Sequence, residues 1–232
     1  FIEVAYEHLS GRAMFIWGDT VVGNHYYRIW DGAALSAANI PLAAATPHIP
    51  AMGDEADWVR LVPDPTSNRL MYGVQDGSRD LNTRLWNGAA WDTAVQHPEH
   101  DPTTENVNDR NFDIVFETDP ANAGKAWLLW GNGGNTSRKQ WNGAAWGGVT
   151  NFGDDAALVQ LMAHPRTGTI FAGIYQATGS ATDDITALQN VGGAWSAETI
   201  IWGGAITSNL YERVFIAPER YVPIINWREI YP

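Results

Sequence analysis

A tandem repeat constrains the fold of this chain more than any other feature of its sequence. The segment LWNGAAWD (Leu85 to Asp92) returns as QWNGAAWG (Gln140 to Gly147) and, less closely, as IWDGAALS (Ile29 to Ser36). A fourth version ends in VGGAWS (Val191 to Ser196). The copies align on Gly32, Gly88, Gly143 and Gly192. These glycines are 56, 55 and 49 residues apart, a period typical of propeller blades, whose small sheets cannot bury both faces alone.

The second copy shows the expected internal order of a unit. WVRLVPDP (Trp58 to Pro65) alternates like a strand, and RLMYGVQD (Arg69 to Asp76) follows a turn as its hairpin partner. NTRLWNG (Asn82 to Gly88) and AAWDTAV (Ala89 to Val95) predict a third and a fourth strand. We expect Asn-Gly to form a tight hairpin turn between them, because this pair tolerates positive φ. Four strands are the number expected of a propeller blade.

The repeat predicts an all-β, propeller-like domain of four-stranded antiparallel blades spanning residues 1–232. The predicted units are residues 1–57, 58–110, 111–156, 157–209 and a partial fifth, 210–232. The fifth begins with YERVFIAPE (Tyr211 to Glu219) and has room for two strands. A five-bladed ring with an incomplete last blade is the first choice. A four-bladed ring with a C-terminal hairpin is the alternative, and an open or two-sheet arrangement is also compatible with the repeat.

The composition agrees with this fold and excludes some partners. Charged residues make up 17% of the chain, which has 12 Trp, 23 Gly and 12 Pro, a balance that favours short strands and turns over helices. The net charge of −12 repels nucleic acid and anionic membrane surfaces. The chain has no cysteine, and none of its apolar runs approaches the ~18 residues of a membrane-spanning helix. We therefore expect neither nucleic-acid binding nor direct membrane insertion by this segment.

Several segments together resemble a known kind of repeat. They are VAYEHLSGRAMFIWGD, WVRLVPDP, LWNGAAWD, NFDIVFETD, QWNGAAWG and the closing INWREIYP. The combination resembles tandem repeat regions of uncharacterised secreted or surface proteins of bacteria and archaea, and the resemblance covers nearly the whole chain. It implies a location outside the cell, in a surface protein or filament, and no particular chemistry. Asn190 departs from the pattern, because it replaces the first Trp of the motif.

Catalytic and metal-binding motifs are weak in this sequence. HPEHDP (His97 to Pro102) groups imidazoles with carboxylates, but it lacks the helical spacing of a zinc motif and is expected in a solvated loop. Acidic segments at 53–57, 76–80, 106–111 and 153–157 could offer oxygen ligands to Ca²⁺, although Asp and Asn at strand ends more often form turns. No nucleophile elbow, P-loop or dinucleotide fingerprint occurs, and the S-x-D-x-G-x-x-W box of sialidases is absent. We predict no enzyme activity, no resident cofactor and no metal site, with Ca²⁺ as the alternative.

The repeated Trp is the best candidate for ligand binding. Trp30, Trp86 and Trp141 each follow a cation by two residues, and indole rings stack on the apolar faces of sugars. The cations at these positions are Arg28, Arg84 and Lys139. Alternate strand positions face opposite ways, however, so Trp and the following Asn do not share a face. Structural packing of these indoles is the favoured interpretation, and a sugar site built on Trp30, Trp86, Trp141, Arg28 and Arg84 is the alternative.

These observations lead to two hypotheses about function. The first is a non-enzymatic, extracellular structural or adhesive module, whose partners are other copies of itself or adjoining domains. The second is a lectin-type propeller that binds glycans. They differ in whether the repeated Trp rings are buried or exposed.

Overall fold

The computed structural model describes residues 2–18, 25–36, 40–41, 56–76, 80–92, 95–97, 110–176 and 184–203. These residues form antiparallel β-sheets and one 3₁₀ turn, η2 (Pro120–Asn122), with no α-helix in the described ranges. The all-β prediction is therefore confirmed for this part of the chain. None of its helical segments is long and apolar enough to cross a membrane.

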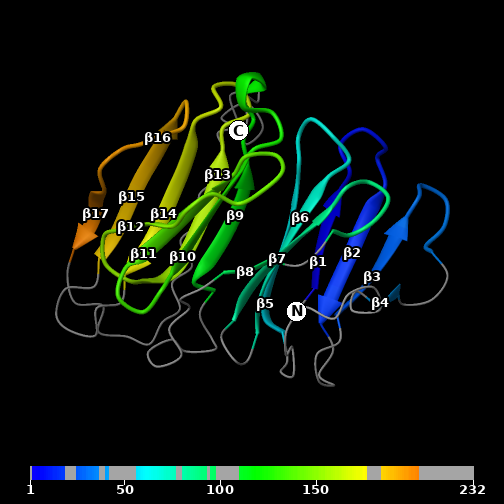
Figure 1. The fold of residues 1–232 in the computed structure, drawn as a ribbon, viewed down its shortest axis with the longest axis horizontal. Helices are drawn as coiled ribbons and strands as arrows, with labels where there is room; N and C mark the ends of the chain where they lie inside the picture. The colour runs from blue at the N-terminus through cyan, green and yellow to red at the C-terminus, as the bar shows by residue number, and fades with distance from the viewer. Residues whose placement is uncertain are drawn as a thin grey trace, which may run out of the picture.

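The strands fall into four sheets that follow one another along the chain (Figure 1). Sheet A contains β1 (Ile2–Tyr6), β2 (Ala13–Gly18), β3 (His25–Trp30) and β4 (Ile40–Pro41). Sheet B contains β5 (Ala56–Pro63), β6 (Leu70–Asp76), β7 (Leu81–Trp86) and β8 (Val95–His97). Sheet C contains β9 (Phe112–Phe116), β10 (Ala126–Gly131), β11 (Thr136–Trp141) and β12 (Thr150–Phe152). Sheet D contains β13 (Ala156–Ala163), β14 (Ile170–Gln176), β15 (Asp184–Val191), β16 (Ala194–Trp195) and β17 (Thr199–Gly203).

The sheets reproduce the predicted repeat. Sheets A, B and C each have four antiparallel strands in chain order, and sheet D adds the short strand β16. β5 and β13 begin at Ala56 and Ala156, close to the unit boundaries expected from the sequence. The partial fifth unit at 210–232 lies outside the described residues, so the number of blades and the closure of the ring stay predictions.

Every sheet has two distinct faces, because side chains that lie directly opposite each other on antiparallel neighbours point the same way. Val4 on β1 lies opposite Phe15 on β2, which lies opposite Arg28 on β3. We call the face that carries them the front face, and the one that carries Met14 the back face. Aligning the sheets on the turn that joins their first two strands gives Leu61, Ile114 and Leu161 at the Val4 position. The same alignment gives Met71, Trp127 and Phe171 at the Met14 position.

The core consists of three layers between consecutive sheets, in which a front face packs on the back face of the preceding sheet. The A–B layer contains Met14, Ile16, Leu61, Tyr72 and Trp86. The B–C layer contains Met71, Leu85, Ile114, Leu128, Trp130 and Trp141. The C–D layer contains Trp127, Leu129, Leu161 and Ala172. Burying each large apolar side chain contributes about 1.5–3 kcal/mol, so these layers supply the main stabilisation.

The turn of the WNGxxW motif differs from the expected two-residue hairpin. Trp86 pairs with Trp91, which leaves four residues, 87–90, between them. Asn87 is the first of the four, and its Oδ1 accepts hydrogen bonds from the N–H groups of Ala89 and Ala90, both at 2.9 Å. Gly88 supplies the positive φ of +97°. The Asn87 side chain thus accepts the hydrogen bonds of two backbone N–H groups in the turn, which favours this wider turn. A two-residue turn does occur in the fourth copy, at Gly192 and Gly193.

Turns at one end of the sheets also join consecutive units. Arg12 Nη2 in sheet A donates to the carbonyl oxygen of Gly88 in sheet B at 2.6 Å. Arg69 in sheet B repeats the contact through Nη1, with the carbonyl oxygen of Gly143 in sheet C at 3.3 Å. Arg69 crosses directly over Gly124, where a Cβ atom would lie 1.9 Å from its Nη2. The positive φ of Gly124, +78°, favours glycine here, and a Cβ atom would displace the Arg69 guanidinium.

Two histidines are buried at the contacts between sheets. The His25 Nδ1 atom and the Tyr72 hydroxyl form a buried hydrogen bond between sheets A and B. His97 Nε2 lies 2.8 Å from Thr83 Oγ1. Burial disfavours the charged imidazolium and lowers the pKa of His25 to about 4 and that of His97 to about 3. Both rings are therefore neutral in the folded protein at neutral pH.

We predict that acid destabilises the fold through these histidines. In the unfolded chain these histidines bind protons below pH about 6.5, whereas in the folded chain His25 and His97 stay neutral until the pH nears their lowered pKa values. Stability therefore falls as the pH drops from about 6.5 towards 4. Denaturant unfolding at pH 7.5 and 4.5 measures the effect. Over this interval the free energy of unfolding of His97→Gln should fall by about 3 kcal/mol less than that of wild type. His8→Gln removes a histidine from an exposed turn and is the matched control. Identical pH dependence in His97→Gln and wild type would contradict the prediction.

Candidate functional site

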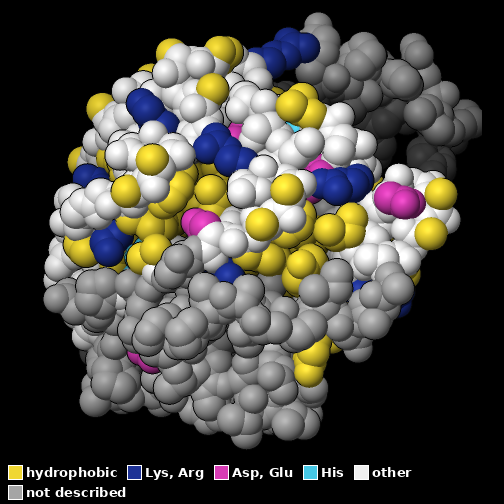
Figure 2. Space-filling model, turned by 45° about the vertical axis from the view of Figure 1, so that its right-hand side comes forward, with side chains coloured by type: hydrophobic (Ala, Val, Ile, Leu, Met, Phe, Trp, Pro, Cys, Tyr) yellow, Lys and Arg dark blue, Asp and Glu magenta, His cyan; other side chains and the backbone are white. Residues whose placement is uncertain are grey.

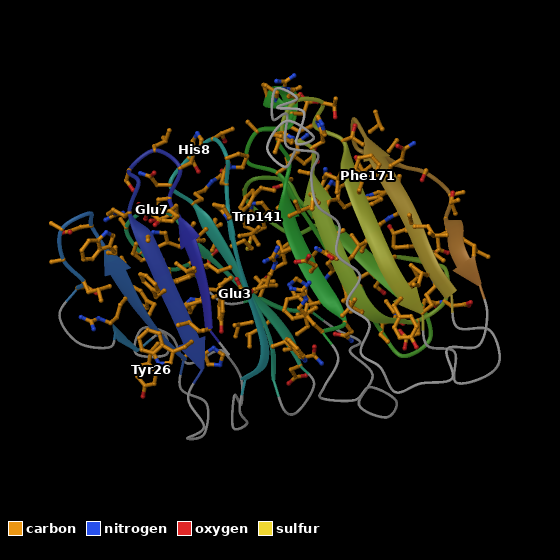
Figure 3. All side chains as sticks on the ribbon, turned by 180° about the vertical axis from the view of Figure 1, so that it is seen from behind. Glu3, Glu7, His8, Tyr26, Trp141 and Phe171 are labelled. Atoms are coloured by element: carbon orange, nitrogen blue, oxygen red, sulfur yellow. The ribbon has the colours of Figure 1, made fainter. Side chains whose placement is uncertain are left out.

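The repeated indoles Trp86 and Trp141 belong to the core and not to a binding surface. Their exposed fractions are 3% and 5%, and both lie on front faces that are covered by the preceding sheet. Trp86 Nε1 donates to Glu7 Oε1 at 2.6 Å, across the A–B contact. Trp141 lies in the interior between sheets B and C (Figure 3). The ring faces that sugar stacking requires are not available, which corrects the ligand-binding hypothesis for these two residues.

Glu7 joins several parts of the A–B contact. Its carboxylate accepts hydrogen bonds from Arg12 Nε and Nη2, both at 2.8 Å, and from the Ser10 hydroxyl and the Trp86 indole. Burial alone would raise the pKa of Glu7, but the hydrogen bonds from Arg12, Ser10 and Trp86 outweigh it and hold the pKa below its usual value. This network is structural, because it joins Ser10 and Arg12 in the β1–β2 turn to Trp86 at the end of β7.

The repeated cations also stabilise the hairpin that carries the motif. Arg28 donates from Nε and Nη2 to the carbonyl oxygen of Ser36 at 3.0 and 2.5 Å. Arg84 is buried, and its Nε donates to the equivalent carbonyl oxygen of Asp92 at 2.6 Å. The binding role suggested for Arg84 is therefore corrected too, since its guanidinium is buried against its own hairpin.

Trp30 and Arg28 differ from their counterparts because no described sheet precedes sheet A. Both are half-buried on its front face, where Trp30 lies opposite Ala13 and Arg28 lies opposite Phe15. The structure thus separates the sequence-predicted site residues. Trp86, Trp141 and Arg84 are interior, whereas Trp30 and Arg28 keep solvent contact on one terminal sheet.

A row of polar residues follows the first strands of the sheets, which run side by side. Glu3, Arg60 and Asp113 occupy the same position on β1, β5 and β9. Arg60 Nε lies 2.6 Å from Asp113 Oδ1, and Arg60 Nη1 lies 3.8 Å from Glu3 Oε1. Asp113 is fully buried and also accepts a hydrogen bond from Leu161 N–H at 2.8 Å. We call these three residues the inner polar row.

The inner polar row is a shared ion pair and not a pair of free carboxylates. Burial raises the pKa of Glu3 above its usual value despite the attraction of Arg60. The negative charge of Asp113 raises the pKa of Arg60, which outweighs the opposing effect of burial. Arg60 thus pairs with Asp113 and attracts the carboxylate of Glu3, so the three residues form one charge network.

The second Trp of the motif lies in the gap between consecutive sheets. In the A–B gap, the Trp91 ring centroid is 5.8 Å from that of Tyr27. In the B–C gap, the Trp146 ring centroid is 5.2 Å from that of His97, and Trp146 Nε1 donates to Thr83 Oγ1 at 3.0 Å. Trp91 and Trp146 are half-buried. Each gap therefore presents one indole near a polar group.

The C–D gap has a different composition from the other two. Arg138 on β11 takes the position of Tyr27 and Thr83, and its guanidinium carbon lies 4.9 Å from the Phe152 ring centroid and 5.6 Å from that of Trp195. All three side chains are half-buried. Burial lowers the pKa of Arg138, although an arginine stays charged. Within the described residues no carboxylate forms an ion pair with Arg138.

A carboxylate faces the same gap from sheet D. Glu198 Oε1 accepts hydrogen bonds from Gln176 Nε2 at 2.9 Å and from Thr186 Oγ1 at 3.3 Å. Burial raises the pKa of Glu198 and outweighs these bonds. Glu198 lies against Gly153, where a Cβ atom would be 2.2 Å from Oε2. The C–D gap therefore combines two aromatic rings, a cation and a carboxylate. We call Arg138, Phe152, Trp195 and Glu198 the C–D gap site.

Sequence reasoning missed the C–D gap site. Trp195 belongs to the recognised motif, but only the packing of sheet D on sheet C shows that its ring lies beside Arg138. Arg138 and Phe152 lie outside the motif, so no repeated signal could have identified them. His97, which was expected in a solvated loop, is instead a buried residue of β8.

The described residues contain no group of three or more His, Asp or Glu side chains arranged to hold a metal ion. Most of the acidic segments considered for Ca²⁺, at 53–57, 76–80 and 106–111, lie largely outside those ranges. In the segment at 153–157, Asp155 accepts a hydrogen bond from Gly133 N–H in the β10–β11 turn at 3.0 Å. The prediction that the chain has no resident cofactor stays a prediction.

Comparison with solved structures identifies similar folds. A BP39L lectin from Burkholderia pseudomallei matches 87% of the chain with a TM-score of 0.58 and 13% identity. A fucose-specific lectin from Aleuria aurantia matches 87% with a TM-score of 0.51 and 10% identity. An exo-β-1,3-galactanase from Phanerochaete chrysosporium, solved with β-1,3-galactotriose, matches 86% with a TM-score of 0.51 and 13% identity. These are β-propeller lectins and glycosidases, so the similarity supports a propeller-type arrangement of the sheets.

The chain spans 55%, 60% and 49% of the lengths of these three structures. No protein-family model and no curated protein matches the sequence. The similarity therefore concerns the fold, and the binding chemistry rests on the residues of this chain.

We predict that Trp86 determines stability. Trp86→Ala should lower the free energy of unfolding by about 3–5 kcal/mol, because it opens a cavity in the A–B layer. Trp86→Phe fills most of that space and loses the hydrogen bond to buried Glu7, so its cost should be smaller, about 1–3 kcal/mol. Denaturant unfolding at neutral pH measures both values. A change below 1 kcal/mol in Trp86→Ala would show that the indole is not a core residue.

Proposed function

We propose that this chain is a glycan-binding module of propeller type and that the C–D gap site is its principal binding site. Sugars present an apolar face, which stacks on aromatic rings, and hydroxyl groups, which need donors and acceptors. Phe152 and Trp195 supply the rings, Arg138 supplies donors, and Glu198 supplies an acceptor. The observation that carries the proposal is the half-buried guanidinium of Arg138, held between two ring faces without a carboxylate partner among the described residues.

The other two gaps fit a ligand less well. In the B–C gap, Trp146 Nε1 and Thr83 Oγ1 bond to each other, and the same hydroxyl also contacts His97. The A–B gap brings Tyr27 and Trp91 against buried Trp86, and its described residues include no comparable cation–aromatic pair. In the B–C gap Trp146 and Thr83 bond to each other, whereas in the C–D gap the Arg138 guanidinium faces aromatic rings. We therefore assign the ligand to the C–D gap.

The proposal includes a non-enzymatic role. Its support is the inner polar row, in which Arg60 pairs with Asp113 and lies near Glu3. Glycan binding without hydrolysis suits an adhesive module at the cell surface or outside the cell, which is the location implied by the repeat resemblance. Location and adhesion are parts of the proposal that follow from binding and need their own tests.

We predict that the C–D gap site determines glycan affinity. Glycans are first identified on an array of defined oligosaccharides, and their affinity is then measured by isothermal titration calorimetry. Arg138→Leu should weaken binding about tenfold or more, because a hydrogen bond to a charged donor contributes about 1.5–3 kcal/mol. Trp195→Leu should weaken binding to a similar extent by removing a stacking ring.

Arg28→Leu is the matched control, because Arg28 is also a half-buried arginine of a third strand but lies on the front face of sheet A. It should bind like wild type. Circular dichroism and thermal melting establish that all variants fold. The assignment to the C–D gap is wrong if Arg28→Leu loses affinity and Arg138→Leu keeps it, and the function is wrong if the folded wild type binds no glycan.

We also predict that the chain does not hydrolyse the glycans it binds. Incubation with each bound oligosaccharide, followed by chromatographic analysis of the products, should show intact ligand only. Product formation that disappears in Glu3→Gln or Asp113→Asn would contradict the non-enzymatic role and assign catalysis to the inner polar row.

A further inference from the structure

The repeat leaves one front face and one back face that no other described sheet covers. Each layer joins the back face of one sheet to the front face of the next, so the A–B, B–C and C–D layers use three faces of each kind. The front face of sheet A and the back face of sheet D remain. These two faces lie at opposite ends of the row of sheets, and Figure 3 places Tyr26 and Phe171 on opposite sides of the molecule.

The front face of sheet A has the character of an interface. Val4 is 50% exposed, whereas its equivalents Leu61, Ile114 and Leu161 are 3%, 0% and 3% exposed because a preceding sheet covers them. Ile2 and Tyr6 on the same face are also exposed. Half-buried aromatic residues continue this face across β2 and β3, and Trp17 stacks on Tyr26 with 6.0 Å between ring centroids. The side of the molecule shown in Figure 2 displays exposed hydrophobic side chains across its middle.

The back face of sheet D has the complementary character. Phe171 is 40% exposed, whereas its equivalents Met14, Met71 and Trp127 are 1%, 1% and 8% exposed under the following sheet. Met162, at the position of buried Ala5, is half-buried. In sheets A, B and C the residue at the Phe171 position is buried in one of the three layers. Apolar residues at repeated interface positions that remain exposed indicate a docking surface.

We propose that the front face of sheet A binds the back face of sheet D of a second copy of this chain. The three layers within the chain show that faces of these two kinds are complementary. Among the described sheets one front face and one back face are left, so the pairing between copies is head to tail, with Val4 and Phe171 on opposite sides of the contact. Such heterologous contacts produce a ring if the rotation closes and a filament if it does not.

The test measures molar mass by size-exclusion chromatography with multi-angle light scattering over a range of concentrations. Wild type should exceed the monomer mass of 25.5 kDa. Val4→Glu and Phe171→Glu each place a charge on one of the two faces and should each yield monomers. The control is Leu9→Glu, because Leu9 is exposed but lies in the turn between β1 and β2, outside both faces. Leu9→Glu should assemble like wild type.

Mixing the variants tests the head-to-tail pairing itself. Val4→Glu keeps an intact back face and Phe171→Glu keeps an intact front face, so an equimolar mixture should form a one-to-one dimer while each variant alone stays monomeric. Strictly monomeric wild type would overturn the proposal and would fit coverage of these faces within the chain or by an adjoining domain. A mixture that stays monomeric, or a Leu9→Glu variant that fails to assemble, would also overturn it.

Discussion

The packing of each front face on the back face of the preceding sheet is the interaction on which the rest of this structure depends. A four-stranded sheet with apolar residues on both faces cannot be stable in water alone, so the repeat has to stack. The indoles of Trp86 and Trp141 are part of this stacking, as are the turn contacts of Arg12 and Arg69. Because the first Trp of the motif is buried in this packing, the proposed ligand chemistry uses side chains in the gaps.

Much of the fold followed from local pattern. The period of about 50 residues and the alternating strands predicted four-stranded units; sheets A, B and C have four strands, and sheet D has five. The alternation also predicted that Trp86 and Asn87 do not share a face. It could not predict which face a neighbouring sheet covers, so the burial of Trp86 and the exposure on the terminal sheet A became visible only in three dimensions. The turn was missed because the Asn87 side chain caps two backbone donors, which local propensity alone does not determine.

The candidate site was less predictable, because it joins residues distant in sequence. Arg138 and Phe152 come from sheet C, and Trp195 and Glu198 come from sheet D, so the site exists only where the two sheets meet. The proposed glycan site and the proposed contact between copies use different surfaces. The first lies within the C–D gap and the second on the front face of sheet A and the back face of sheet D. Assembly would therefore multiply binding sites without covering them, which raises avidity for repeated glycans.

The central claim is that the first Trp of each motif packs the fold while a half-buried indole in the C–D gap contacts ligand. Hydroxyl-radical footprinting, read residue by residue by mass spectrometry with and without a bound oligosaccharide, tests it most directly. Trp86 and Trp141 should be modified as slowly as fully buried Trp130, and Trp195 should be modified faster and become protected by the oligosaccharide. Rapid modification of Trp86 and Trp141 that the oligosaccharide suppresses, with Trp195 unaffected, would contradict the account.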